Sequence, residues 1–404
     1  MATNLPRKHE VPPTAGLPPR WRDLLPLGAG GDLARCAANF LGAQSVQVEC
    51  SGTASLVVAL TTLHRRSGRR VVIVPAYTCP LVALAVAHCG LELRLCDLAP
   101  DSIDFDPVQL AALCDPDTLA LVPTHLGGRV ADIATAIAIA RRSGAYVIED
   151  AAQAFGARRD GRAVGLEGDI GFFSLAVGKG LTTYEGGLLV ARDGAMRAEL
   201  ARTSRELIPE RLDWELKRSL QLLGYHALYR PSLLRFAYGV PLRRALRRED
   251  PVTAVGDDFS LPIPLHTLGR WRQSVGAHAL SRLPEFLEAT AAQALVRKAQ
   301  LAKIDGIAVV DDAVDAHGTW PFLMVRMRSP AARDAALERL WSAGVGVSRL
   351  FIHAMPDYDH LAGIVAAQDV PNARAFAATT LTISNSLWLG DDEFEAICAV
   401  LETA

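Results

Sequence analysis

The sequence lacks an excess of charge of either sign, paired cysteines and metal-ligand spacings. Its 404 residues carry 42 Lys and Arg against 44 Asp and Glu, which argues against a nucleic-acid-binding protein. Seven cysteines form no CxxC pair, and such a scattered, odd set indicates reduced thiols. The ten histidines show no ligand spacing with cysteine or acid, so we expect no metal site.

A secretory leader and the common nucleotide and hydrolase motifs are also lacking. Residues 1–26 contain six prolines and scattered charges, so we expect a cytoplasmic protein. Residues 71–91 carry no charge, but Pro75 and Pro80 divide them. This pattern predicts a buried strand followed by a core helix rather than a membrane span. GAGGD at 28–32 lacks GxGxxG spacing and is interpreted as a loop, and no GxSxG motif occurs.

Short apolar runs alternate with helix-like segments. Strand-like runs lie at 71–75, 91–97, 119–125, 145–150, 169–175 and 186–191, and a helix is predicted at 131–144. A second part of the chain includes a long helix near 283–304, the apolar run 319–327, a helix at 332–344 and a last helix after Asp391. The alternation predicts an α/β fold with a mainly parallel sheet between helices. Ligands bind beyond the carboxyl ends of such strands, so the residues that follow each strand are the candidates for a site.

The chain is long enough for a large domain and a smaller one. We expect a proline-rich arm at 1–26, a large α/β domain at 27–300 and a small C-terminal α+β domain at 301–404. Between about 202 and 264 the strand–helix alternation stops, and we interpret this stretch as a helical insertion on the large domain.

The insertion contains a strongly basic stretch. Residues 217–248 hold eight basic and no acidic side chains, namely Lys217, Arg218, Arg230, Arg235, Arg243, Arg244, Arg247 and Arg248. A solvated helical surface or a subunit contact explains such a stretch. Binding to an anionic partner, either a substrate diphosphate or an anionic membrane surface, is the other interpretation, because basic residues beside Leu, Phe and Tyr suit an interfacial helix.

Two predicted element ends carry groups that suit a phosphorylated aromatic ligand. Gly52 and Thr53 open an apolar helical stretch, where free backbone N–H groups suit a phosphate, although such residues more often only cap a helix. Asp150 ends the strand-like run 145–150. A buried acid there can hold a proton on a heteroaromatic nitrogen, and capping of the next helix is an equal alternative.

Lys179 lies just past another strand in a glycine-flanked loop. Taken alone, a loop lysine is nearly always a solvated surface charge. Near an aromatic aldehyde, however, a deprotonated lysine can form a Schiff base. A phosphate cradle, a strand-end acid and a loop lysine in this order outline a site for pyridoxal 5′-phosphate.

These groups lie within longer stretches that are typical of one family. The stretches are SGTASLVVAL (51–60), VIVPAYTCPLVALAV (72–86), PTHLGGRVADI (123–133), VIEDAAQAFGA (147–157), GDIGFFSLAVGKGLTTYEGGLLV (168–190) and LERLWSAGVGVSRLFIH (337–353). With them the sequence resembles the DegT/DnrJ/EryC1/StrS family of fold type I aminotransferases. The resemblance implies a seven-stranded, mostly parallel sheet, a smaller C-terminal domain and a homodimer with shared active sites.

The resemblance also implies roles for single residues. Lys179 would form the Schiff base with pyridoxal 5′-phosphate and act as the proton shuttle, Asp150 would pair with the pyridine nitrogen, and Gln153 would lie against the ring. The remaining implied contacts are the phosphate, held by Gly52, Thr53 and Ser174, and the substrate side, lined by Glu185. Some relatives carry histidine in place of this lysine and act as dehydratases, so its presence favours amino transfer.

The sequence departs from the family pattern at two places. Cys79 stands where the family usually has an aromatic residue stacked on the cofactor, and cysteine cannot stack. The family also has an Asn that reaches the neighbouring subunit's phosphate, whereas the matching region 264–280 contains no Asn. His266 and Arg270 are the candidates to replace it.

The implied activity is transfer of an amino group, with L-glutamate as the expected donor, to a keto-sugar attached to a nucleotide. The product would serve polysaccharide, glycan or natural-product biosynthesis. A cyclitol or another polyol-like ketone is an alternative acceptor. A pyridoxal-phosphate-binding, membrane-peripheral component of polysaccharide assembly without turnover is the alternative from a different class.

Overall fold

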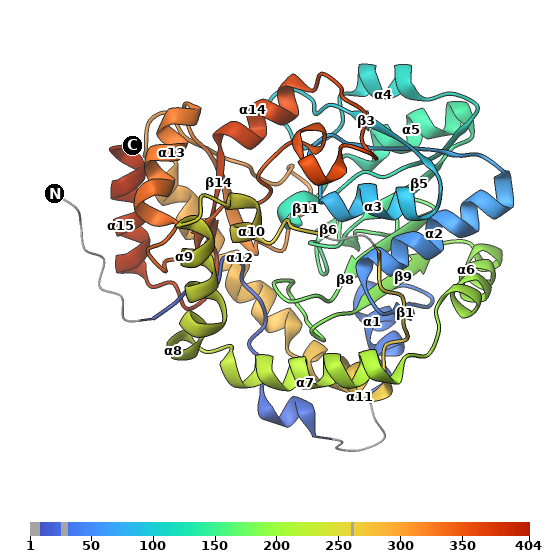
Figure 1. Ribbon diagram of the computed structural model, residues 1–404, viewed down its shortest axis with the longest axis horizontal. Coiled ribbons are helices and arrows are strands. Elements are labelled where there is room, and N and C mark those ends of the chain that lie inside the picture. Colours follow the sequence, from blue (N-terminus) through green and yellow to red (C-terminus); the bar gives the residue numbers. More distant parts are fainter. Residues whose placement is uncertain (1–8, 26–30, 260–261) are drawn as a thin grey trace.

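A seven-stranded sheet forms the centre of the computed structural model, which describes residues 9–25, 31–259 and 262–404 (Figure 1). The strands follow the order β1 (Gln47–Glu49), β9 (Gly187–Ala191), β8 (Ile170–Ser174), β5 (Tyr146–Asp150), β4 (Thr118–Leu121), β2 (Val71–Pro75) and β3 (Glu92–Cys96). Strand β9 runs antiparallel to both neighbours, and the other pairs are parallel. The mostly parallel α/β sheet is therefore confirmed.

Helices cover the sheet, and local signals define their ends. They are α1 (Leu33–Leu41), α2 (Gly52–Ser67), α3 (Pro80–His88), α4 (Pro107–Leu113), α5 (Ile133–Ser143) and α6 (Gly194–Leu207). Asp132 caps α5 by accepting a hydrogen bond from the amide of Thr135, and Gly144, with φ of 68°, ends it. The uncharged run 71–91 forms the wholly buried strand β2 and helix α3. Residues 28–30 of GAGGD lie outside the described residues, and Asp32 caps α1.

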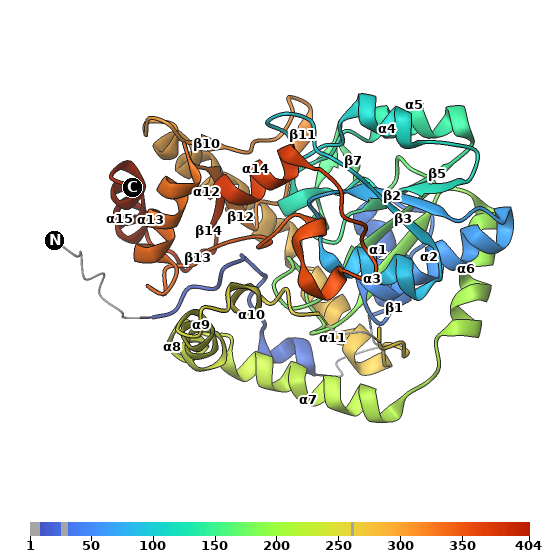
Figure 2. The ribbon, with the colours of Figure 1, turned by 45° about the horizontal axis from the view of Figure 1, so that its top comes forward.

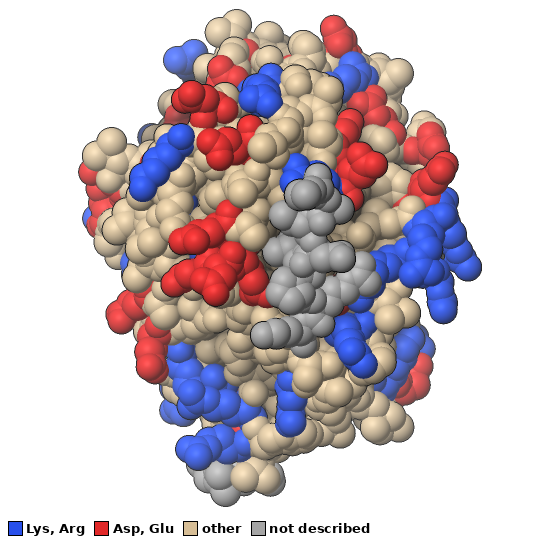
Figure 3. Space-filling view, turned by 90° about the vertical axis from the view of Figure 1, so that its left-hand side faces the viewer, with Lys and Arg blue, Asp and Glu red and all other residues tan. Residues whose placement is uncertain are grey.

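A smaller antiparallel sheet follows along the chain. Its order is β10 (Ala308–Val309), β12 (Phe322–Arg326), β14 (Thr380–Ser384) and β13 (Val347–Ser348), and helices α13 (Pro330–Leu340), α14 (Pro371–Thr379) and α15 (Asp391–Glu402) accompany it. The long helix α12 spans Leu283–Leu301, and α13 ends earlier than expected, at Leu340. A third sheet joins β6 (Arg158–Arg159) and β7 (Arg162–Ala163) to β11 (Ala316–His317). Figure 3 shows the side of the molecule where α13 and α15 lie, with acidic and basic side chains intermixed.

The predicted insertion is helical. It contains α7 (Leu212–Leu228), α8 (Pro231–Leu234), a π-helical turn (Arg235–Gly239), α9 (Val240–Leu246) and α10 (Pro251–Val255), and α11 (Arg270–Leu280) follows it. Helix α7 runs along the lower edge of the molecule (Figure 2). Among the described residues, no helix combines the length and the apolar character that crossing a bilayer requires, and no three His, Cys, Asp or Glu side chains gather into a metal-binding group.

The described part of the proline-rich arm, residues 9–25, contacts both the C-terminal part of the chain and the loop between β8 and β9. Its Val11 forms a bridge to Val345 beside the smaller sheet, and Glu10 pairs with Arg243 of α9 at 2.9 Å. Further along, the amide of Leu17 donates to the carbonyl of Gly180 at 2.8 Å. The arm therefore contacts the loop that carries the predicted lysine, a contact that its proline content alone does not indicate.

Candidate active site

Lys179 lies in the loop between β8 and β9, beyond the end of β8. Its amide donates to the carbonyl of Ala176 at 3.2 Å, and its side chain is partly buried. Burial lowers the pKa of the Lys179 amine, and the nearby Cys79 and Asp150 oppose this shift only in part. A lowered pKa increases the neutral fraction of the amine, which is the form that attacks an aldehyde.

Asp150 ends β5, the central strand of the large sheet, and is buried. Its Oδ1 accepts a hydrogen bond from the amide of Ala152 at 3.0 Å. Burial raises the pKa of the carboxyl, and the Ala152 amide and Lys179 counteract part of that rise. The backbone is held on one side by the neighbouring segment, because Asp150 N donates to Pro123 O and His125 N donates to Asp150 O, both at 2.9 Å.

Cys79 and Gln153 lie near these two groups. Cys79 stands at the start of α3. Burial raises the pKa of its thiol to about 12, although Lys179 opposes the shift, so the side chain is a neutral thiol at pH 7. Gln153 follows β5, and its Oε1 accepts a hydrogen bond from the amide of Gly127 at 2.7 Å.

The first turn of α2 packs against the end of β8. Ser51 caps the helix, accepting from the amide of Ala54 at 3.0 Å. A Cβ on Gly52 would lie 3.1 Å from the Cβ of Ser174, so glycine permits this close approach. Gly52, Thr53 and Ser174 therefore share one edge of the sheet, where unpaired N–H groups of a helix start suit an anion.

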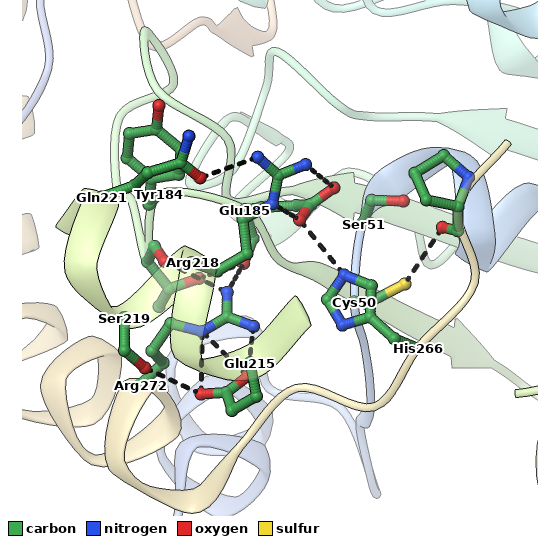
Figure 4. A network of polar contacts seen from close by, with 12 residues as sticks. Cys50, Ser51, Tyr184, Glu185, Glu215, Arg218, Ser219, Gln221, His266 and Arg272 are labelled. Carbon is green, nitrogen blue, oxygen red and sulfur yellow. Dashed lines mark hydrogen bonds and ion pairs between the residues drawn. The ribbon is translucent and has the colours of Figure 1, made fainter. Parts of the chain in front are cut away.

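Glu185 and His266 meet in a polar network with helix α7 (Figure 4). Glu185 forms an ion pair with Arg218 of α7, and its Oε2 lies 3.2 Å from Nε2 of His266. Burial alone would raise the pKa of Glu185, but His266 and Arg218 together hold it below the ordinary value. Nδ1 of His266 lies 3.0 Å from the carbonyl of Thr267, so both ring nitrogens of His266 are engaged within the chain. Arg270 is exposed at the start of α11, apart from this network.

Sequence reasoning missed a buried pair directly behind Asp150. Glu149 and His125 are fully buried, and Nε2 of His125 donates to Glu149 Oε2 at 3.0 Å. The same carboxylate accepts from the amides of Gly165 and Glu167, each at 2.7 Å, and from Gly168 at 2.6 Å. Burial by itself raises the pKa of Glu149, but the hydrogen bonds from His125 and the loop amides outweigh it and lower the pKa. The only sequence signal for either residue is that both lie in stretches that resemble the family.

Replacing Glu149 by glutamine should release the 165–168 loop. Glutamine cannot accept all four hydrogen bonds, and breaking such a buried pair costs about 3 kcal/mol. We therefore expect the amides of Gly165 and Gly168 to exchange with deuterium about 100-fold faster. Because the pKa of Glu149 is lowered, its stabilisation is complete above about pH 4.3 and is lost as the pH falls through the folded-state value. The difference in exchange rate between Glu149→Gln and the wild type should therefore shrink in acid. Glu288 is exposed on α12, so Glu288→Gln is the control and should leave the exchange rates unchanged.

Two further groups near the site were not predicted. Arg272 is buried and joins the insertion to the loop before β9: its Nη2 lies 2.6 Å from Glu215 of α7, and its Nη1 donates to the carbonyl of Glu185 at 2.7 Å. In the last part of the insertion, Asp257 accepts a hydrogen bond from the hydroxyl of Tyr358 at 2.5 Å. These partners are far apart in sequence, so no local pattern pairs them.

Comparison with known proteins identifies the family. The sequence profile of the DegT/DnrJ/EryC1/StrS aminotransferase family matches residues 31–213 and 270–402, which is well over half of the chain. The protein belongs to the DegT/DnrJ/EryC1/StrS aminotransferase family. Aminotransferases of this family depend on pyridoxal 5′-phosphate.

Individual family members resemble the chain to different extents. GDP-perosamine synthase of Caulobacter vibrioides is 27% identical over 90% of this chain and 87% of its own length. The L-glutamine:2-deoxy-scyllo-inosose aminotransferase of Streptoalloteichus tenebrarius is 37% identical over 43% of this chain and 40% of its own length. The chain spans only 34% to 43% of the length of the curated relatives to which it is 34% to 39% identical. The structure of the sugar aminotransferase CalS13 from Micromonospora echinospora matches with a TM-score of 0.74 at 21% identity, over 98% of this chain and 100% of that one, and shows the same fold.

The residues at this edge of the sheet fit the family's cofactor. The start of α2, where Gly52 lies close to Ser174, suits the phosphate of the cofactor. The buried carboxylate of Asp150 suits its ring nitrogen, and the partly buried Lys179, whose amine has a lowered pKa, suits its aldehyde.

Proposed function

We propose that this protein is a pyridoxal-phosphate-dependent aminotransferase that uses Lys179 and Asp150 at the edge of the large sheet. When bound, pyridoxal 5′-phosphate supplies an aldehyde that takes up the amino group and a ring that withdraws electrons. The observation that carries the proposal is that the buried Asp150 ends β5 while Lys179 follows the adjacent, paired strand β8, so that each shifts the pKa of the other. The family assignment and the helix start beside Ser174 support it.

The chain's own side chains would divide the work. Lys179 would hold the cofactor through its amine and would carry the proton that amino transfer moves. Asp150 would favour a proton on the pyridine nitrogen, because a nearby anion stabilises a positively charged ring. Gly52, Thr53 and Ser174 would hold the phosphate, Gln153 and Cys79 would lie on the ring side, and Glu185 would line the substrate side.

The proposed acceptor is a keto-sugar linked to a nucleotide, and the proposed donor is L-glutamate. Similarity to GDP-perosamine synthase over 90% of the chain supports this acceptor. Similarity to a 2-deoxy-scyllo-inosose aminotransferase over 43% of the chain favours a cyclitol ketone as the second candidate. That relative's name specifies L-glutamine, so both amino acids are donors to be compared.

An absorbance spectrum of the purified protein with added cofactor tests the proposal. We expect a yellow protein whose band shifts when excess L-glutamate or L-glutamine is added. Borohydride reduction before the donor is added should fix the cofactor on the peptide that contains Lys179. A protein that takes up no cofactor, or a yellow protein that neither donor changes, contradicts an aminotransferase. The latter result is the one expected of a binding protein without turnover.

We also propose a homodimer with shared active sites, in which the partner compensates for the missing Asn. The engaged ring nitrogens of His266 and the exposed position of Arg270 make Arg270 the better candidate to reach a neighbouring subunit. A weak contact of residues 217–248 with anionic membranes stays a prediction. Of the eight basic side chains, Arg218 and Arg243 are paired with Glu185 and Glu10.

A further inference from the structure

Helix α7 carries an apolar stripe on its outer side. Leu212, Leu216, Leu220 and Leu223 are exposed to 83%, 64%, 59% and 39%. Their spacing of four, four and three residues places them on one helix face, and Ala227 extends that face by another turn. The helix lies along the lower edge of the molecule (Figure 2). The family profile stops at residue 213 and resumes at 270, so nearly all of α7 belongs to a part of the chain that the profile does not cover.

The opposite side of α7 is firmly attached to the body of the protein. Leu222 is fully buried. Trp214 stacks on the ring of His266 with centroids 5.6 Å apart, Glu215 pairs with Arg272 at 2.6 Å, and Arg218 pairs with Glu185. The helix therefore cannot turn its leucines inward, and exposed apolar stripes of this kind mark interaction surfaces.

We propose that the outer face of α7 packs antiparallel against α7 of a second copy of this chain, around a two-fold axis that passes close to Leu220. In a two-fold interface, when one residue faces another, the reciprocal contact forms as well. Placing the axis there sets Leu212 against Ala227 and Leu216 against Leu223 of the other copy. Gly224 lies beside the stripe, and a Cβ built on it meets nothing within 4 Å, so there is room for the facing helix to approach.

The charges at the two ends of α7 favour this arrangement. Glu210 is exposed just before the amino end, where Arg211 and Asp213 pair with each other at 2.6 Å, and Arg230 is exposed just past the carboxyl end. An antiparallel pair centred near Leu220 brings Glu210 of one copy to Arg230 of the other. An anionic membrane along the same stripe would offer Glu210 no basic partner. Charge complementarity therefore favours a second copy over a lipid surface.

A single cysteine at the axis tests the geometry. Leu220→Cys should form an intermolecular disulfide under mild oxidation, because a residue on a two-fold axis faces its own copy within disulfide range. Leu295→Cys on α12 is the control, because Leu295 is exposed to 68% and Leu220 to 59%. This control should form no more disulfide-linked dimer than the wild type, which has seven free cysteines. Equal cross-linking of both variants overturns the proposal.

Sedimentation of charge variants supplies an independent test. Leu220→Glu should weaken self-association at least 10-fold, or halve the mass of the assembly if another interface also exists, whereas Leu295→Glu should change neither. Glu210→Arg and Arg230→Glu should each weaken association, and both changes in one chain should restore it. An unchanged assembly in Leu220→Glu overturns the proposal. The proposal is also overturned if Leu220→Glu keeps the mass of the wild-type assembly but no longer binds vesicles of anionic lipid. That result would identify the stripe as a membrane-binding surface.

Discussion

Replacing Lys179 by alanine is expected to slow amino transfer by about 10³-fold, within the range that a positioned proton-transfer group contributes. The variant loses the covalent link to the cofactor and the group that moves the proton. The amine of Lys179 in the wild type is suited to both tasks, because burial lowers its pKa. Single-turnover absorbance with L-glutamate measures the effect, and borohydride should no longer fix the cofactor on the chain.

The exposed Lys303 provides the matched control, since Lys303→Ala removes a lysine without touching the site. A small primary amine added to Lys179→Ala should restore part of the rate by carrying the proton in solution. If Lys179→Ala transfers the amino group within a few-fold of the wild-type rate, the reactive amine is a different one and the assignment of this loop is wrong.

The second large effect is expected from Asp150→Asn, which should lower the rate about 10² to 10³-fold, as removal of one preorganised electrostatic group does. Asparagine has the same shape and can still accept the hydrogen bond from the Ala152 amide. It lacks the charge that favours protonation of the pyridine ring. The cofactor should therefore still attach to Lys179, while the step that withdraws electrons from the substrate carbon slows.

Asp160→Asn is the control for this variant, because Asp160 is exposed and has a positive φ of 48° that asparagine also tolerates. Borohydride trapping shows whether the cofactor remains attached, and the half-reaction with L-glutamate shows whether chemistry is slowed. Loss of attachment together with loss of rate would point to a collapsed site rather than to a missing charge.

Local patterns predicted most strands of the sheet, although β4 ends at Leu121 rather than at 125 and β1 was not predicted. The β-branched run at 71–75 and the capped helix ending at Gly144 depend on neighbours in sequence, and the structure places both as expected. Glu149 was missed although it adjoins Asp150. Successive strand residues face opposite ways, so its partners come from His125 and from the loop at 165–168.

The basic insertion shows a different limit. Residues 217–248 were interpreted as one charged stretch, but a helix separates its side chains by face. Arg218 lies on the inner side of α7 beside Glu185, while Leu216 and Leu220 face outward. A count of charges along the sequence does not contain this division, and the partner of Arg243 lies in the N-terminal arm.

The reversed direction of β9 determines how the predicted lysine is carried. Because β9 runs antiparallel to β8, the segment between them turns back directly as a hairpin. Its two arms stay paired beyond the sheet, through Leu175 N to Gly186 O at 2.8 Å and Thr183 N to Leu175 O at 3.0 Å. Lys179 therefore lies in a hairpin loop that is fixed by hydrogen bonds between its two arms. Because the loop is already fixed, it loses little conformational entropy when the cofactor binds. This preorganisation should increase the affinity for the cofactor without any additional contact.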